Sequence, residues 1–221
     1  MSINSSQKIK CPSCGLLQEV TVWNSITVKD SPDLKKDLLS GSVNIFLCQA
    51  CSHKGLIPTP MLYHDEEKKL LISFSPCEDE NLKNRLLNSV CEQSKESGEL
   101  KKYEEYNLRF VCEYNSLLEK ILIFDNNLND KAIEIIKLLI LSQEPDKQDN
   151  RTCIFGKKEN DKLEFIVQDF KEGQIYTSSV PAETYETIWQ QLRYSGVKPY
   201  SFDWEMVDSD YANRLINGIN N

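Results

Sequence analysis

The sequence predicts an α+β protein with three parts: an N-terminal ribbon with β-hairpins, a mainly helical middle segment and a small α+β unit at the C-terminus. Three observations support this fold class. Two CxxC pairs enclose β-branched segments in the first third of the chain. Apolar residues repeat at helical spacing through residues 78–143. Three strand-like segments follow residue 150, and a helical pattern follows them.

Strands are expected at three places in the N-terminal third. Residues 20–28 are rich in β-branched side chains and predict a strand with a turn near Asn24 and Ser25. Residues 43–47 return as a strand that leads to the second CxxC pair. Residues 61–63 and 70–74 flank a polar turn and therefore predict a hairpin.

Helices are expected at three places before residue 143. Ser31 and Pro32 suit the first positions of a short helix that Gly41 can end. Residues 82–91 carry apolar side chains at helical spacing. Residues 130–142 are apolar nearly all round, which predicts a helix in the middle of a core.

A strand and a fourth helix are expected between the helices at residues 82–91 and 130–142. Residues 108–114 alternate apolar and polar side chains, as a half-buried strand does. Ser116 and Glu119 form a capping-box pattern at the start of the next helix. Glu119 also belongs to a group of charged residues between two apolar helices, which could pair across a groove but which capping and solvation explain adequately: Glu119, Lys120, Asp125 and Asp130.

The last part of the chain follows the polar run PDKQDN, residues 145–150, which we interpret as a linker. Strands are expected at residues 153–155, 163–170 and 175–180, with helices from Pro181 and near residues 209–219. These elements set the expected domains: residues 8–143, made of a ribbon (8–76) and a helical part (78–143), and a small α+β unit over residues 151–221.

The four cysteines Cys11, Cys14, Cys48 and Cys51 carry the most specific signal in the chain. Two residues between paired cysteines allow a tight knuckle turn that aims both sulfurs at one ion, and two knuckles supply four soft ligands. We therefore expect one structural zinc ion in a ribbon. Gly15 follows the first knuckle, where a left-handed conformation is often required. Ser52 stands at the same place in the second knuckle and Gly55 comes later, so we expect a looser turn there.

Other metals and ligands stay open at this point. Four cysteines can also hold iron in a rubredoxin-like site. His53 follows the second knuckle and is a candidate to replace a cysteine or to donate to a thiolate, although four sulfurs already saturate zinc. The remaining cysteines have no paired spacing: Cys77, Cys91, Cys112 and Cys153. Cys91 and Cys112 lie on the apolar faces of a predicted helix and strand, where a thiol behaves as a small apolar side chain.

The sequence resembles the CpXC domain proteins of bacteria and archaea. The resemblance covers residues 8–143 and rests on the segments CPSCG (11–15), SPDLK (31–35), CQAC (48–51), PMLYHD (60–65), LEKI (118–121) and residues 130–137, together with Gly41. The second knuckle departs from the family pattern, because Gln49 stands where the family commonly carries proline. The resemblance implies a zinc-binding domain of unassigned activity.

Charge and composition restrict the classes of function. The chain has a net charge of −8, which argues against a surface that tracks nucleic-acid phosphates. Residues 1–76 hold eight lysines, no arginine and seven acidic residues, so this part is near neutral. Residues 1–10 lack the apolar core of a secretory signal, and the longest apolar run, residues 138–141, is far too short for a membrane span. We expect a cytoplasmic protein without a membrane partner, and its oligomeric state is open.

Three functions are compatible with these features. The leading hypothesis is a non-enzymatic zinc ribbon that binds another protein. Nucleic-acid binding is the second, motivated by lysines near the knuckles but disfavoured by the acidic chain: Lys8, Lys10, Lys35, Lys36 and Lys54. An enzyme is the third, with His64 and Asp65 beside Glu119 as candidate catalytic residues. In this hypothesis the neighbouring Asp65 orients His64 and raises its pKa, but no nucleophile or second base is identifiable.

Overall fold

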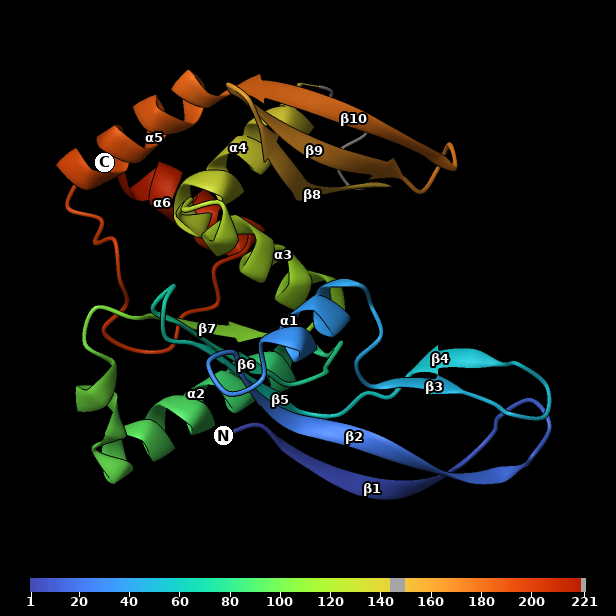
Figure 1. The fold of residues 1–221 in the computed structure, drawn as a ribbon. Coiled ribbons are helices and arrows are strands. Elements are labelled where there is room, and N and C mark those ends of the chain that lie inside the picture. The colour runs from blue at the N-terminus through green and yellow to red at the C-terminus, as the bar shows by residue number, and fades with distance from the viewer. Residues whose placement is uncertain (144–149, 220–221) are drawn as a thin grey trace. The chain divides into compact units, whose positions relative to one another are not determined.

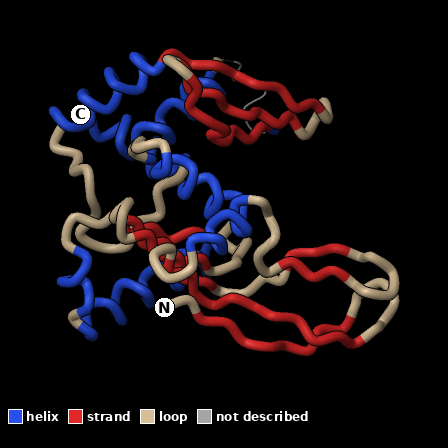
Figure 2. Tube along the Cα trace, in the orientation of Figure 1, coloured by secondary structure: helices blue, strands red, loops and turns tan. Residues whose placement is uncertain are grey.

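The computed structural model describes residues 1–143 and 150–219 (Figure 1). Contacts within the chain divide it into two compact units. The N-terminal unit comprises Met1–Leu118 with Phe202–Trp204, and the C-terminal unit comprises Glu119–Ser201 with Glu205–Asn221. Each unit mixes helices and strands (Figure 2), which confirms the α+β class. The domain boundaries expected from the sequence stay a prediction, and of the expected linker all but Asn150 lies outside the described residues.

The N-terminal unit is built on a five-stranded mixed sheet in the order β1-β2-β5-β6-β7. The pairs β2/β5 and β6/β7 are parallel, and the pairs β1/β2 and β5/β6 are antiparallel. The expected hairpin of β5 and β6 is confirmed. The strands are β1 (Ile3–Lys10), β2 (Leu17–Thr27), β5 (Met61–Asp65), β6 (Leu70–Phe74) and β7 (Asn107–Val111).

The turn expected near Asn24 and Ser25 is wrong, because β2 runs through both residues. Ser25 pairs with Ile3 on β1 and with Leu62 on β5. The β1 register then shifts from Ile3↔Ser25 to Asn4↔Trp23, so Asn24 is the extra residue of a β-bulge. Asn24 therefore marks an irregularity inside a strand, while pairing on both sides keeps the strand continuous.

The first strand was not expected, because its sequence is polar. β1 lies at the edge of the sheet, and seven of its eight residues are exposed. Its partner β2 supplies the backbone hydrogen bonds that hold it. No hydrophobic pattern is needed for such an edge strand, so periodicity could not reveal it.

Two smaller elements complete the ribbon. Helix α1 (Pro32–Leu39) begins with proline and is followed by Gly41 at φ +67°, as the sequence predicts. β3 (Ile45–Leu47) and β4 (Lys54–Leu56) form a two-stranded antiparallel sheet around the second CxxC pair.

Helix α2 (Glu80–Ser97) and the short helix η1 (Glu99–Tyr103) follow the ribbon. The Asp79 side chain caps α2 by accepting from the N–H of Leu82, and Gly98 ends it in the left-handed conformation. A cluster around Leu71, Leu108 and Trp204 packs with apolar residues of α2.

The C-terminal unit combines a three-stranded antiparallel sheet with helices. The sheet has the order β10-β9-β8, and α4 contacts β8, α5 and α6. The elements are the part of α3 (Tyr114–Asp125) from Glu119 onward, α4 (Asp130–Ser142), β8 (Arg151–Glu159), β9 (Lys162–Asp169), β10 (Gln174–Pro181), α5 (Ala182–Tyr194) and α6 (Ser209–Ile219). The expected strands and helices after residue 150 are thus confirmed. In residues 1–143 and 150–219, no helix has the length and hydrophobicity that crossing a bilayer requires.

Glu119, Lys120 and Asp130 belong to a buried network of α3 and α4, so their interpretation as capping and solvated groups is wrong for these three residues. Lys120 Nζ lies 2.9 Å from Glu134 and 3.2 Å from Asp130, and all three side chains are at most 4% exposed. Lys137 Nζ lies 2.9 Å from Glu119 and 3.0 Å from Glu134. The capping box is also wrong, because α3 begins at Tyr114 and thus before Ser116.

Each charge in this network is held by an opposite charge. Burial by itself would lower the pKa of Lys120, but Glu134 and Asp130 outweigh this effect and raise it. Burial would raise the pKa of Glu134, but Lys120 and Lys137 lower it. The network stays ionised inside the core because its members compensate each other.

We predict that Lys120→Met destabilises the protein by about 3–5 kcal/mol, because it removes the buried cation that pairs with both Asp130 and Glu134. Urea denaturation followed by circular dichroism measures the loss. Lys36→Met is the control, since Lys36 pairs with Asp33 on the surface and its loss should cause no measurable change. Equal effects of the two substitutions would contradict the role of the network.

Candidate metal centre

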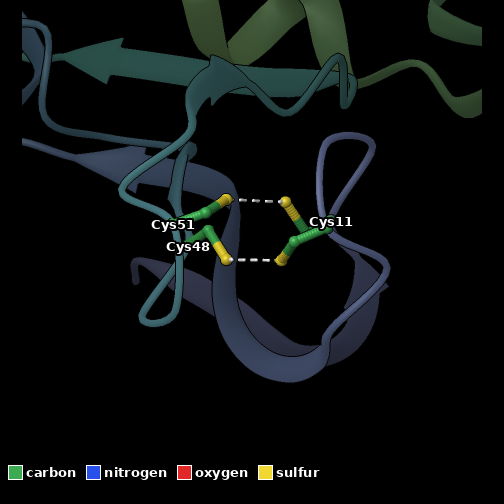
Figure 3. Close-up of side chains that lie close together, drawn as sticks. Cys11, Cys48 and Cys51 are labelled. Atoms are coloured by element: carbon green, nitrogen blue, oxygen red, sulfur yellow. Dashed lines mark hydrogen bonds between the residues drawn. The ribbon is translucent and has the colours of Figure 1, made fainter.

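The two CxxC pairs lie in turns that connect neighbouring strands of the ribbon. Cys11 and Cys14 lie between β1 and β2, and Cys48 and Cys51 lie between β3 and β4. The side chains of the two turns face each other (Figure 3). Cys11 and Cys48 are buried, whereas Cys14 and Cys51 are exposed. Each turn thus supplies one inner and one outer sulfur.

The two turns have the same backbone hydrogen bonds. The N–H of Gly15 donates to the carbonyl of Cys11 at 3.0 Å, and the N–H of Ser52 donates to that of Cys48 at 3.0 Å. In addition, the N–H of each first cysteine donates to the carbonyl five residues later, which belongs to Leu16 (2.8 Å) and His53 (2.9 Å). The bonds fix both turns as closed knuckles.

Both knuckles require a left-handed residue after the second cysteine. Gly15 has φ +77°, as predicted, and Ser52 has φ +58°. The looser second turn expected from Ser52 is wrong, because Ser52 takes the glycine-like conformation and keeps the same hydrogen bond. A residue with a Cβ in this region costs about 1 kcal/mol or more, which the second knuckle bears.

The four sulfurs form a group that could hold a metal ion. All four Sγ atoms lie within 4.8 Å of one another. The distance from Cys11 Sγ to Cys51 Sγ is 3.6 Å, and that from Cys14 Sγ to Cys48 Sγ is 3.5 Å. Both distances are far longer than a disulfide bond of about 2.05 Å, and all eight cysteines of the chain are free thiols.

The protonation of the sulfurs shows why a cation suits this place. The N–H of Cys51 lowers the pKa of Cys48 to about 6, against the opposing effect of burial. The N–H of Leu16 also acts to lower the pKa of Cys14, but the Cys48 sulfur and burial outweigh it and raise the pKa to about 12. The group of four sulfurs therefore favours a thiolate at Cys48 in the second knuckle and opposes one at Cys14 in the first. A divalent ion would remove this repulsion between sulfurs.

Two polar side chains that the sequence did not single out hold the knuckles in place. The Gln18 side chain donates to the carbonyl of Leu47 at 2.9 Å and accepts from the N–H of Gln49 at 3.1 Å. Gln49 uses the N–H that a proline would lack, and proline is the residue expected there from the family pattern. Gln18 thus links β2 to the second knuckle.

Asn44 makes a second link, between the segment before β3 and the strand β2. Its side chain accepts from the N–H of Trp23 at 2.7 Å and donates to the carbonyl of Trp23 at 2.9 Å. This is the pairing that a neighbouring strand would provide. Asn44 is buried and has φ +53°, a conformation that asparagine tolerates. An asparagine near a predicted strand gives no signal for such a contact.

The apolar core of the ribbon is small. The buried residues packed together here are Cys11, Val22, Phe46, Cys48 and Ile57. Two of these five are cysteines of the knuckles. His53 is half-buried and does not belong to the group of four sulfurs.

Asp65 serves the structure of the N-terminal unit. Its carboxylate lies 2.8 Å from Lys35 Nζ and accepts from the Tyr63 hydroxyl at 3.3 Å and from the N–H of Lys68 at 3.2 Å. Burial is the largest effect and would raise the pKa of Asp65, but Lys35, the N–H of Lys68 and the Tyr63 hydroxyl together outweigh it and hold the pKa below its usual value. The negative charge of Asp65 is therefore paired with Lys35 and hydrogen-bonded to the backbone of the turn after β5.

His64 has a different environment from Asp65. The two are consecutive residues of β5, so their side chains point to opposite faces of the sheet and Asp65 does not orient His64. The His64 ring packs against Tyr103 and Tyr106 at 5.7 Å between ring centroids. The expected rise of its pKa is wrong, since burial lowers the pKa and favours the neutral ring.

The third candidate residue, Glu119, belongs to the C-terminal unit. Its carboxylate accepts from the N–H of Phe155 at 2.6 Å and pairs with Lys137. Both oxygens are used in the buried network of α3 and α4. The Glu119 carboxylate therefore has a structural role in the C-terminal unit.

The left-handed residues of the knuckles give a direct test. We predict that Gly15→Ala destabilises the metal-bound protein by about 1 kcal/mol, and that Ser52→Gly stabilises it by a similar amount. A Cβ on Gly15 would meet Lys10 at an ordinary 3.6 Å, so the cost comes from φ and not from crowding. Thermal unfolding measures both changes. Gly218→Ala is the control, because that position is open and has no positive φ; a loss there as large as in Gly15→Ala would contradict the explanation.

Comparison with known proteins supports the resemblance noted in the sequence. Residues 9–137 match the family described as CpXC protein, and this range includes all four cysteines of the centre. No curated protein and no solved structure matches the chain. Because the matched range covers more than half of the 221 residues, the chain belongs to the CpXC family.

Proposed function

We propose that the protein binds one structural zinc ion through Cys11, Cys14, Cys48 and Cys51, and that it is a non-enzymatic module that binds another protein. The observation that carries the zinc assignment is the convergence of four sulfurs within 4.8 Å. A tetrahedron with zinc–sulfur bonds of about 2.3 Å has sulfurs about 3.8 Å apart. The measured pairs at 3.5 and 3.6 Å are close to that spacing.

The role of the metal follows from the small ribbon core. Five buried residues pack together there, and two of them are metal-ligand candidates. Structural zinc supplies about 10–16 kcal/mol of apparent binding free energy in zinc-finger peptides, which exceeds the stability of many domains. We infer that zinc closes the fold of the ribbon. CxxC pairs serve as metal ligands in reducing compartments, which fits the expected cytoplasmic location.

A centre with four protein sulfurs leaves no position for water or substrate, so it favours a structural role over catalysis. The enzyme alternative rests on His64, Asp65 and Glu119. Asp65 and Glu119 are engaged by lysines within their own units, and His64 lacks an orienting carboxylate. We therefore keep the enzyme as the least favoured alternative.

Exposed leucines beside the knuckles support protein binding. Leu16 and Leu17 follow the first knuckle, and Leu47 precedes the second. The Gln18 bond to the Leu47 carbonyl places the two segments next to each other. We propose these leucines as the contact surface for a partner protein, since aliphatic side chains exposed together mark interaction sites.

Nucleic-acid binding remains the second alternative. Lys8, Lys10 and Lys54 are exposed near the knuckles and suit phosphate contacts. Lys35 and Lys36, however, pair with Asp65 and Asp33, which leaves fewer positive charges for phosphates. Binding that does not weaken with increasing salt would exclude this alternative.

We predict that Cys14→Ser removes the stoichiometric metal and lowers the melting temperature, because a serine hydroxyl is a poor ligand for zinc. Native mass spectrometry with elemental analysis measures the ion and distinguishes zinc from iron. Cys77→Ser is the control, since Cys77 lies outside the group of four and should keep both metal and stability. Unchanged metal content in Cys14→Ser would refute the proposed centre.

We also predict that Leu47→Glu abolishes cross-linking of the full chain to its partner protein, because it places a charge in the proposed contact surface. Quantitative cross-linking in an extract of the source cells measures this. Leu139→Glu is the matched control, since Leu139 on α4 is 48% exposed and Leu47 is 56% exposed. Partner recovery that is equal for both variants would argue against the ribbon surface, whatever the metal content.

A further inference from the structure

The two larger sheets end in four edge strands, and three of these are protected. β1 carries Lys8 and Lys10, and β8 carries Arg151, Lys157, Lys158 and Glu159. All five residues of β7 are buried. Charged side chains and coverage are the devices by which proteins prevent edge strands from pairing with other chains.

The fourth edge strand, β10, has neither device. Its eight residues, QIYTSSVP, include no charged side chain, and six of them are exposed. Antiparallel pairing to β9 uses the backbone groups on one side of β10 (Figure 1). The groups on the other side face the open edge of the sheet, over a length of about 27 Å.

Apolar side chains accompany this open edge. Ile175 is 68% exposed, and Tyr176 beside it is 39% exposed. Ile166 on β9 pairs with Thr177 and is exposed on the same face of the sheet as Ile175. A long, neutral and partly apolar edge is a template for another strand.

We propose that β10 is the dimerisation surface of this protein and pairs in antiparallel fashion with β10 of a second copy. Two sheets of three strands then become one sheet of six strands. A two-fold axis at Thr177 pairs Thr177 with its own copy and aligns Gln174–Val180 of one strand with Val180–Gln174 of the other, so that paired side chains share a face of the sheet. No like charges meet along the paired strands, because the strand has none.

The residues next to β10 favour a second copy as the occupant. Lys171 precedes the strand and Glu183 follows it. In a two-fold antiparallel pair, the start of one strand lies beside the end of the other, so Lys171 of each copy faces Glu183 of its partner. Both residues are exposed, and neither has an ion-pair partner among the described residues of its own chain. Lys171 and Glu183 thus offer one pair of opposite charges at each end of the neutral strand, although the turn that holds Lys171 also holds Glu172.

Sedimentation velocity and light scattering on the full chain test this proposal between about 1 and 100 µM. We expect a species of twice the 25.5 kDa chain mass at the upper concentrations. Thr177→Lys places two like charges near the axis and should raise the dissociation constant about tenfold. An equimolar mixture of Thr177→Lys and Thr177→Glu should restore the dimer, because opposite charges then meet.

Thr152→Lys is the matched control. Thr152 is an exposed threonine on the same face of the sheet, but it lies on β8 at the opposite edge. It should leave the dissociation constant unchanged. A wild-type protein that stays at 25.5 kDa throughout, or equal weakening by Thr152→Lys and Thr177→Lys, overturns the proposal. A monomer would leave β10 as an edge for a strand of a different protein.

Discussion

The N-terminal unit depends on the convergence of four cysteine sulfurs from two knuckles that are far apart in the sequence. Each knuckle is fixed locally by two backbone hydrogen bonds and a left-handed residue, Gly15 or Ser52. Their meeting depends on long-range contacts, which Gln18 and Asn44 provide between β2 and the segments around β3. Because thiolates repel each other, a bound cation would stabilise this group of four sulfurs.

The C-terminal unit is stabilised in a different way. Its core is apolar, and it contains a network of opposite charges on α3 and α4. Lys120 and Lys137 each serve two carboxylates, and Glu119 uses its other oxygen for the N–H of Phe155. Such a network is satisfied only if every member is in place, which gives the helices one arrangement relative to β8.

The group of four sulfurs and the buried charge network are distinct from the surfaces that we propose for binding. The buried charges hold the core of the C-terminal unit, and the sulfur group is proposed to do the same for the ribbon. The surfaces proposed for interaction are the leucine surface beside the knuckles and the neutral edge of β10. The first is proposed to contact another protein and the second a second copy, so the two surfaces have separate occupants and lie on different units.

The sequence by itself determined the features that local rules govern. The CxxC spacing predicted that four sulfurs converge, and the position of Gly15 predicted its left-handed conformation. Hydrophobic periodicity predicted most helices and strands. Only the tertiary structure decided the features that depend on distant partners. Asn24 became a bulge because β1 and β5 pair on both sides of β2, and Glu119 became a buried ion-pair member because α4 brings Lys137 to it. The physical reason is that backbone conformation is set by neighbouring residues, whereas the partner of a polar group is set by the packing of the whole chain.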